Sequence, residues 1–239
     1  ERIVNNDAVR KVAILIALAI VWELYARWLN NPLLFPSFAE TVATFVGDLS
    51  SGTLIDRVAT SMRSLIYGYG TGLALAAVLT TVAVSTRFGT DILNTLTAMF
   101  NPLPAIALLP LALIWFGLGI GSLIFVIVHS VLWAVSLNTL TGFRAVPEVL
   151  RMSGRNYGLE GLKIGWAFAW RTLIAAELVF GVSSRSGGLG WYIFEARSEL
   201  DTARVFSGLL AVILIGLFVE SVIFRAIEKR TVQRWGMQH

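Results

Sequence analysis

Cysteine is absent from the sequence, and histidine occurs only at His129 and His239. The lack of thiols excludes disulfide bonds and thiolate metal sites, and so few histidines exclude a histidine-rich metal site. Charged residues are also scarce: they make up 14% of the 239 residues, whereas 56% are hydrophobic. Because a soluble domain needs a solvated surface, this composition predicts a chain that lies in a lipid bilayer.

Basic residues outnumber acidic ones, and the formal net charge is +4. In a soluble protein this excess would point to nucleic acid, but here the basic residues lie between apolar runs, where they set membrane topology. The sequence has no phosphate-binding loop of the form G-x-x-x-x-G-K-[ST], and the nearest imitation, at residues 187–190, lacks the lysine. Any nucleotide hydrolysis must therefore belong to another chain.

Long apolar runs dominate what the chain does contain. A helix needs about 20 mostly apolar residues to cross the hydrocarbon core. The run over residues 92–143 carries no charge and is too long for one crossing, and its glycine cluster at residues 117–121 predicts a turn between two spans. We therefore predict an all-α membrane protein with a single domain over residues 1–239. Its six spans cover approximately residues 12–29, 57–85, 92–116, 122–142, 161–182 and 205–227.

The distribution of Lys and Arg predicts the orientation, because cytoplasmic loops carry an excess of both. Most basic residues fall on the inner side if the N-terminus is cytoplasmic, and both termini are then cytoplasmic. The connection between the fifth and sixth spans then lies outside. It has apolar residues at helical spacing from Leu189 to Leu200, which predicts a short amphipathic helix at the outer surface.

A stripe of small residues marks the second span. Ser64, Gly68, Gly72 and Ala76 recur at every fourth position. Small side chains on one helical face allow the backbone of another helix to approach closely. The stripe therefore predicts a helix-packing surface.

His129 and Trp133 lie on one face of the fourth span, at a spacing that keeps both on the same side of a helix. A polar and aromatic stripe in a helix of Leu, Ile and Val is typical of a solute path. The alternative is a histidine that hydrogen-bonds between two helices, because one isolated titratable group makes no relay. The sequence leaves both interpretations open.

Arg171 and Glu177 stand near the middle of the fifth span. Charges at that depth cost about 2.5–3.5 kcal/mol each, so they must face protein, water or a solute. Trp170 precedes Arg171 and shares a helical face with Glu177. Two interpretations remain: a structural ion pair across helices, with Glu23 or Glu220 as partner, or a place in the translocation path.

The run NPLPAIALLPLALIWFGLG, from Asn101 to Gly119, closely resembles the third span of permeases of binding-protein-dependent ABC importers. The resemblance is to the branch that handles taurine, alkanesulfonates, nitrate and bicarbonate. Ala-Ala-Glu at residues 175–177 and Gly-Leu-Gly at residues 188–190 match two further motifs of this branch. The resemblance covers nearly the whole chain and implies the type I importer permease architecture.

The resemblance also implies a function and partners. The chain would form the path for a small anionic solute as a homodimer, with two ATPase subunits on the cytoplasmic side and an external solute-binding protein. ATP and Mg²⁺ would be bound by the ATPase, with no enzyme activity or cofactor in this chain, and the location would be the bacterial inner membrane. The alternative is an ion-gradient-driven transporter or a channel, which would favour inverted repeats and paired acids in the spans.

The family has a cytoplasmic loop of the form E-A-A-x-x-x-G, followed by I-x-L-P, which sits in a cleft of the ATPase. Gly158 matches the glycine of this signature, but the acid is absent and the second half is missing after Leu159. We therefore expect the loop, residues 143–160, to lack a stretch after Leu159. The resemblance assigns to ATPase coupling the residues Arg151, Met152, Ser153, Gly154, Arg155, Asn156, Tyr157 and Gly158.

Overall fold

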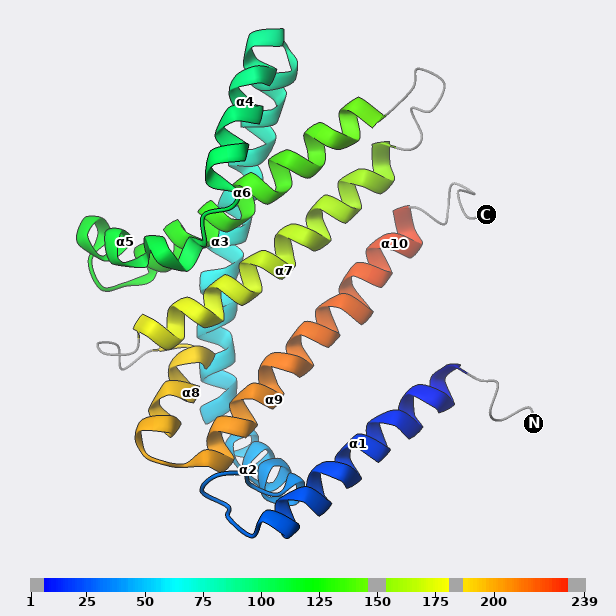
Figure 1. The fold of residues 1–239 in the computed structure, drawn as a ribbon, viewed down its shortest axis with the longest axis vertical. Helices are drawn as coiled ribbons and strands as arrows, with labels where there is room; N and C mark the ends of the chain where they lie inside the picture. The colour runs from blue at the N-terminus through cyan, green and yellow to red at the C-terminus, as the bar shows by residue number, and fades with distance from the viewer. Residues whose placement is uncertain (1–6, 146–153, 181–186, 232–239) are drawn as a thin grey trace.

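The computed structural model describes residues 7–145, 154–180 and 187–231, and within these ranges every regular element is a helix. Figure 1 shows their arrangement. The elements in chain order are α1 (Asp7–Leu29), α2 (Phe38–Ser50), α3 (Thr53–Val84), α4 (Arg87–Phe100), the short 3₁₀ helix η1 (Ala105–Leu108), α5 (Leu109–Phe116), α6 (Ile120–Ala145), α7 (Gly154–Phe180), α8 (Leu189–Ser198), α9 (Thr202–Phe218), the π-helix η3 (Val219–Phe224) and α10 (Arg225–Thr231).

Length and composition identify the helices that can cross a membrane. Within the described ranges, four qualify: Val9–Leu29, Thr53–Val84, Ile120–Thr141 and Thr202–Glu228. A fifth is added if α4 and the η1–α5 segment together form one bent span. Helix α7 has 27 residues, enough for a crossing at 1.5 Å per residue, but it is not among these apolar spans. The chain is therefore an all-helical protein with four or five candidate spans.

The third predicted span differs from the structure. The sequence predicts one helix over residues 92–116, whereas the structure has α4 followed by a segment, Ala105–Phe116, that is bent from it by 85°. Pro102 and Pro104 explain the break, because proline lacks an N–H and disfavours the helical conformation in the residue before it. Gly117, with a φ of 71°, then forms the turn into α6.

The centre of the molecule is the packing of α3 against α6 and α7. Gly68 and Gly72 are buried, and a Cβ added to them would lie 2.7 Å and 2.8 Å from the side chains of Ile127 and Val131. Only glycine permits this approach of α6. The other two residues of the small-residue stripe, Ser64 and Ala76, are also buried on α3.

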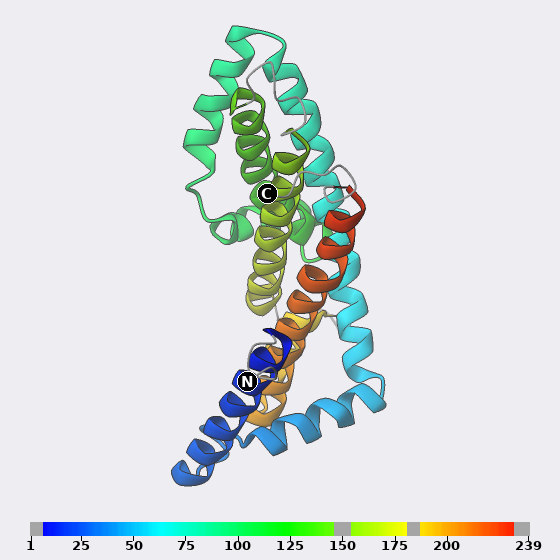
Figure 2. The same ribbon diagram turned by 90° about the vertical axis from the view of Figure 1, so that its right-hand side faces the viewer.

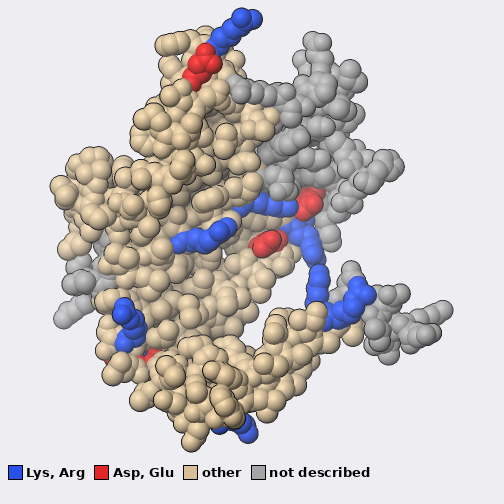
Figure 3. Space-filling view, viewed as in Figure 1, with Lys and Arg blue, Asp and Glu red and all other residues tan. Residues whose placement is uncertain are grey.

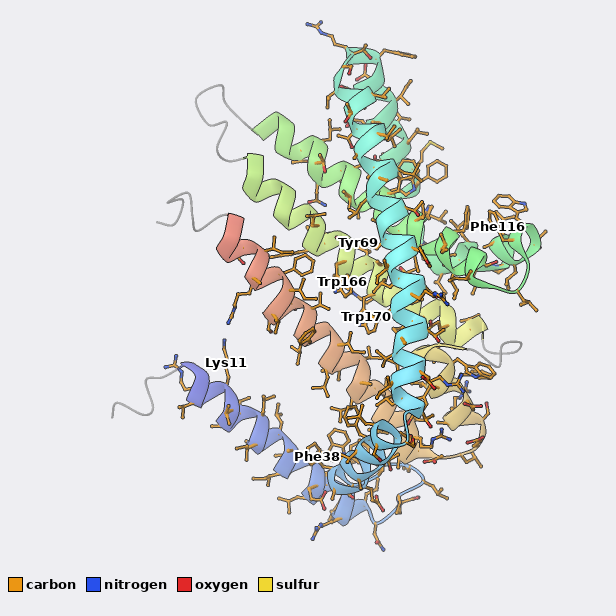
Figure 4. All side chains as sticks on the ribbon, turned by 180° about the vertical axis from the view of Figure 1, so that it is seen from behind. Lys11, Phe38, Tyr69, Phe116, Trp166 and Trp170 are labelled. Carbon is orange, nitrogen blue, oxygen red and sulfur yellow. The ribbon has the colours of Figure 1, made fainter. Side chains whose placement is uncertain are left out.

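A second contact surface joins α7 to the last helices. Trp166 and Trp170 stack with their ring centroids 6.3 Å apart and their planes 5° apart. Trp166 also meets Phe224 of η3 at 6.4 Å and Tyr69 of α3 at 5.9 Å. Figure 4 shows Tyr69, Trp166 and Trp170 where α3 and α7 lie beside the C-terminal helices.

Helices α2, α8 and α9 pack together at one end of the molecule. The buried face of α8 includes Tyr192, whose hydroxyl donates to Asp48 of α2. Burial and the Asp48 carboxylate raise the pKa of the Tyr192 hydroxyl to about 12, so this donor keeps its proton at physiological pH. Leu200, which the sequence predicts on the apolar face, lies beyond the end of α8 and is 76% exposed.

The ends of several helices lie on the side of the molecule opposite α2 and α8. Figures 1 and 2 show on this side the first residues of α1, the last of α6, the first of α7 and helix α10. Helix α5 extends away from the bundle, with Phe116 at its tip (Figures 1 and 4). The face shown in Figure 3 is mostly uncharged, and several of its few Lys and Arg groups lie beside Asp or Glu groups. A mostly uncharged surface agrees with helices that face lipid.

Candidate functional site

A cavity of about 370 Å³ lies where the break between α4 and η1 meets α6 and α7. Pockets of this size hold small ligands, usually on apolar walls with a few polar groups. Its lining residues come from segments far apart in the sequence: Phe100, Asn101, Pro102, Leu103, Pro104, Ala105, Ile106, His129, Ser130, Trp133, Phe168, Arg171, Thr172 and Ala175.

The proline-containing break forms one wall of the cavity. The last hydrogen bond of α4 runs from the Asn101 N–H to the Thr97 carbonyl, at 2.9 Å. Pro104 then takes an extended conformation, and its carbonyl accepts from the Ala107 N–H at 2.9 Å, which starts η1. The two prolines thus hold a short non-helical segment against α6 and α7, where a continuous helix would have passed.

Aromatic rings of α4 and α6 form a second wall. Phe100 and Trp133 are stacked, with ring centroids 5.1 Å apart and planes 16° apart. His129 packs edge-on to Phe100, with a centroid distance of 6.3 Å. Stacked and edge-to-face rings hold one another in fixed orientations. The stacked Phe100 and Trp133 rings therefore make this wall largely aromatic.

Polar atoms in this wall have no partner. Both ring nitrogens of His129 and the indole nitrogen of Trp133 are buried and make no hydrogen bond to any described residue. Buried polar groups are nearly always paired, so an unpaired group needs an explanation such as water, an ion or a ligand. The alternative of a histidine bonded between helices finds no support in these contacts.

Arg171 supplies the positive charge of the cavity. Its side chain is exposed, its Nε donates to the Ala167 carbonyl at 3.1 Å, and its guanidinium carbon lies 5.6 Å from the centre of the Phe168 ring. No carboxylate of the described residues lies within ion-pair distance of it. Most of its five N–H donors are therefore free to bind an anion.

One of the two interpretations left open by the sequence, an ion pair of Arg171 with an acid of another helix, does not occur among the described residues. Glu23 instead pairs with Arg27 at 2.7 Å. Glu220 is exposed on η3. The structure thus brings His129, Trp133 and Arg171 to one cavity, as candidates for a solute path.

Glu177 and Trp170 lie elsewhere. The Glu177 carboxylate is 4% exposed and accepts hydrogen bonds from Ser61 Oγ, at 2.7 and 2.9 Å, and from the Gly190 N–H, at 2.8 Å. Ser61 Oγ in turn accepts from the Leu189 N–H at 2.7 Å. Glu177 therefore ties α3 and α7 to the start of α8, while Trp170 is buried and stacks on Trp166 of the same helix.

Several cavity residues escaped the sequence analysis. Phe168 and Ala175 lie three and four positions from Arg171, and Thr172 lies four positions from Phe168, so the cavity residues of α7 are spaced as neighbours on one side of the helix. That spacing was a usable signal. The contribution of residues 101–106 to the cavity could not be predicted from the sequence, because it depends on the direction of the bend between α4 and η1.

The residues assigned to ATPase coupling are only partly described. Arg151, Met152 and Ser153 lie outside the described residues, and Gly154, Arg155, Asn156, Tyr157 and Gly158 form the backbone of the first turns of α7. Helix α7 continues through Leu159 and Glu160 without a break.

Comparison with known proteins relates this geometry to a family. No protein-family model matches the chain. The taurine transport system permease protein TauC of Escherichia coli is 29% identical over 245 residues, which cover 90% of this chain and 85% of TauC. The nitrate import permease protein NrtB of Synechocystis is 23% identical over 266 residues, 95% of this chain and 93% of NrtB. The chain is a homologue of ABC transporter permeases.

A third relative of this chain comes from a different organism. A Methanocaldococcus jannaschii protein named as an ABC transporter permease is 29% identical over 242 residues, 92% of this chain and 90% of that protein. The similarity to ABC transporter permeases therefore extends over most of the chain and is not confined to the apolar helices around the cavity.

Proposed function

We propose that this chain is the membrane-spanning permease subunit of an ATP-binding-cassette importer and forms the path for a small anionic solute. The observation that carries the proposal is the similarity, over most of the chain, to proteins named as permeases of taurine and nitrate import. The apolar helices fit a multi-pass membrane protein. The cavity with an unpaired Arg171 fits an anionic solute.

The proposed architecture has six crossings in the bacterial inner membrane, with both termini cytoplasmic. The bent α4–α5 segment is the third crossing, and α7 is the fifth. Helix α7 can carry two charges across the membrane because Glu177 is hydrogen-bonded inside the protein and Arg171 faces the cavity. The placement of the ends of α1, α6, α7 and α10 toward one side supports this topology.

The proposed assembly is a homodimer of this chain with two ATPase subunits, which bind ATP and Mg²⁺, and an external solute-binding protein. Coupling to the ATPase uses residues 151–158. The alignment with NrtB runs over 266 residues, more than the 239 of this chain, so that relative contains residues that this chain lacks. We propose that part of this difference lies in the coupling loop, with α7 beginning directly after it.

Co-purification and transport test the proposal. The full chain is co-expressed with a candidate ATPase subunit, purified and reconstituted in proteoliposomes with the cognate binding protein. We expect a stable complex whose uptake of a labelled sulfonate requires ATP. Uptake that runs on an ion gradient without ATP, by a chain that captures no ATPase, would instead establish the alternative of a secondary transporter or channel.

A further inference from the structure

From the walls of the cavity we infer that the solute is an organic anion with a flat apolar body, such as an aryl sulfonate or aryl carboxylate, and not a small inorganic anion. This inference rests on the proposed function and specifies the class of solute. It depends on three properties of the cavity: its volume, its single charge and its aromatic wall.

The volume exceeds the needs of an inorganic anion. The cavity measures about 370 Å³. One water occupies roughly 30 Å³ of the liquid, so the cavity has room for about a dozen waters. A nitrate or bicarbonate ion would fill a small part of it and leave the remaining walls hydrated. A benzene ring with a sulfonate or carboxylate group would fill a larger part of this volume.

The charge lies on one wall only. Arg171 comes from α7, and among the lining residues it is the only Lys or Arg. A guanidinium binds sulfonate or carboxylate oxygens through two parallel hydrogen bonds. Arg171 also lies beside the Phe168 ring, so an apolar surface continues directly from the charged group. The arrangement fits a ligand whose negative charge is at one end.

The wall on α4 and α6 fits the other end of such a ligand. Phe100 and Trp133 present stacked rings, and the prolines at 102 and 104 add apolar surface beside them. A flat apolar body gains stacking and burial against these rings, which a hydrated inorganic ion does not.

The test measures binding to the purified full chain in lipid nanodiscs, with labelled benzenesulfonate as the probe and nitrate and ethanesulfonate as competitors. We expect saturable binding of benzenesulfonate, weaker competition by ethanesulfonate, and the weakest by nitrate. Loss of a charge-assisted hydrogen bond predicts that Arg171→Ala weakens benzenesulfonate binding about tenfold or more. Trp133→Phe replaces the indole with a smaller ring, which reduces the aromatic surface of the wall, and should weaken binding of benzenesulfonate more than that of ethanesulfonate.

Matched control variants distinguish a change in the cavity from a general effect of substitution on the protein. Arg63→Ala removes an exposed arginine of α3 outside the cavity, and Trp115→Phe changes an exposed tryptophan of α5. Both should bind benzenesulfonate like the unmodified chain. Thermal unfolding of each variant shows whether it is folded, and Trp133→Phe, which retains a smaller aromatic ring on the opposite wall, keeps the test valid if Arg171→Ala is unstable.

Nitrate competition as strong as that of ethanesulfonate, or no saturable binding of benzenesulfonate, overturns the inference about the solute. Either result leaves the importer assignment intact if the chain still assembles with the ATPase and supports ATP-dependent uptake. Failure to assemble with the ATPase contradicts the proposed function, while selective benzenesulfonate binding would still support the organic-anion class.

Discussion

At the scale of single residues, the charged groups of Glu177 and Arg171 are accommodated in the apolar helix α7 in two different ways. The Glu177 carboxylate is enclosed by donors from Ser61 and Gly190, whereas Arg171 has only one backbone acceptor and faces a cavity. The sequence places both in one span but does not separate these roles. The difference follows from the helical face each residue occupies: about 120° separates them.

Glu177→Ala tests the structural role. Removing the carboxylate leaves the Gly190 N–H buried without an acceptor, which costs about 1–3 kcal/mol. We expect a lower thermal stability in nanodiscs, with a smaller loss in Glu177→Gln, which keeps one acceptor oxygen. Glu220→Ala, at an exposed position of η3, is the control and should unfold like the unmodified chain.

Arg171→Ala should give the opposite pattern. The side chain is exposed and has no ion pair with a described residue, so the free energy of unfolding should change by no more than about 0.5 kcal/mol. Solute uptake in proteoliposomes should nevertheless be lost, and Arg171→Lys should impair it because an ammonium lacks the planar fork. The exposed Arg63→Ala serves as control. Normal uptake by a stable Arg171→Ala protein would end the assignment of this residue to the anion path.

At the scale of helices, the contact between α3 and α6 depends on glycine at particular positions. Gly68→Ala places a Cβ 2.7 Å from Ile127, so the helices must move apart. We expect a destabilisation of about 1–3 kcal/mol, the usual cost of overpacking. Gly70→Ala is a matched control on the same helix, because nothing lies within 4 Å of its added Cβ. It should be neutral or stabilise the helix by about 0.5–1 kcal/mol. Equal effects of the two changes would refute the packing argument.

The sequence predicts helices well and their directions poorly. The small-residue stripe identifies the face of α3 that meets α6, because close packing requires small side chains wherever the partner lies. The bend of 85° after α4 was missed although Pro102 and Pro104 were visible. Proline predicts that a helix stops but not the direction of the next segment, which tertiary packing decides. The cavity forms at this bend, so its lining could only be predicted in part.

At the scale of the whole molecule, the proposed topology assigns each end of the helix bundle to one side of the membrane. Two exposed serines lie at opposite ends: Ser85, between α3 and α4, and Ser198, the last residue of α8. The proposed topology puts Ser85 on the cytoplasmic side, beside the basic Arg87, and Ser198 outside. The chain contains no cysteine, so Ser85→Cys and Ser198→Cys each create a single thiol that can be labelled.

A membrane-impermeant maleimide applied to intact spheroplasts should label Ser198→Cys and should reach Ser85→Cys only after the membrane is opened. Both side chains are exposed and each bonds only to a carbonyl of its own helical turn, so replacement should not disturb packing. The unmodified chain, which has no thiol, gives the background. Labelling of both variants in intact spheroplasts would contradict the six-span topology, because the third, fourth and fifth proposed crossings lie between these two connections. Three is an odd number, so it puts them on opposite sides of the membrane. The reverse pattern would instead invert the orientation and place residues 151–158, which we propose couple to the ATPase, outside, where no ATP is present.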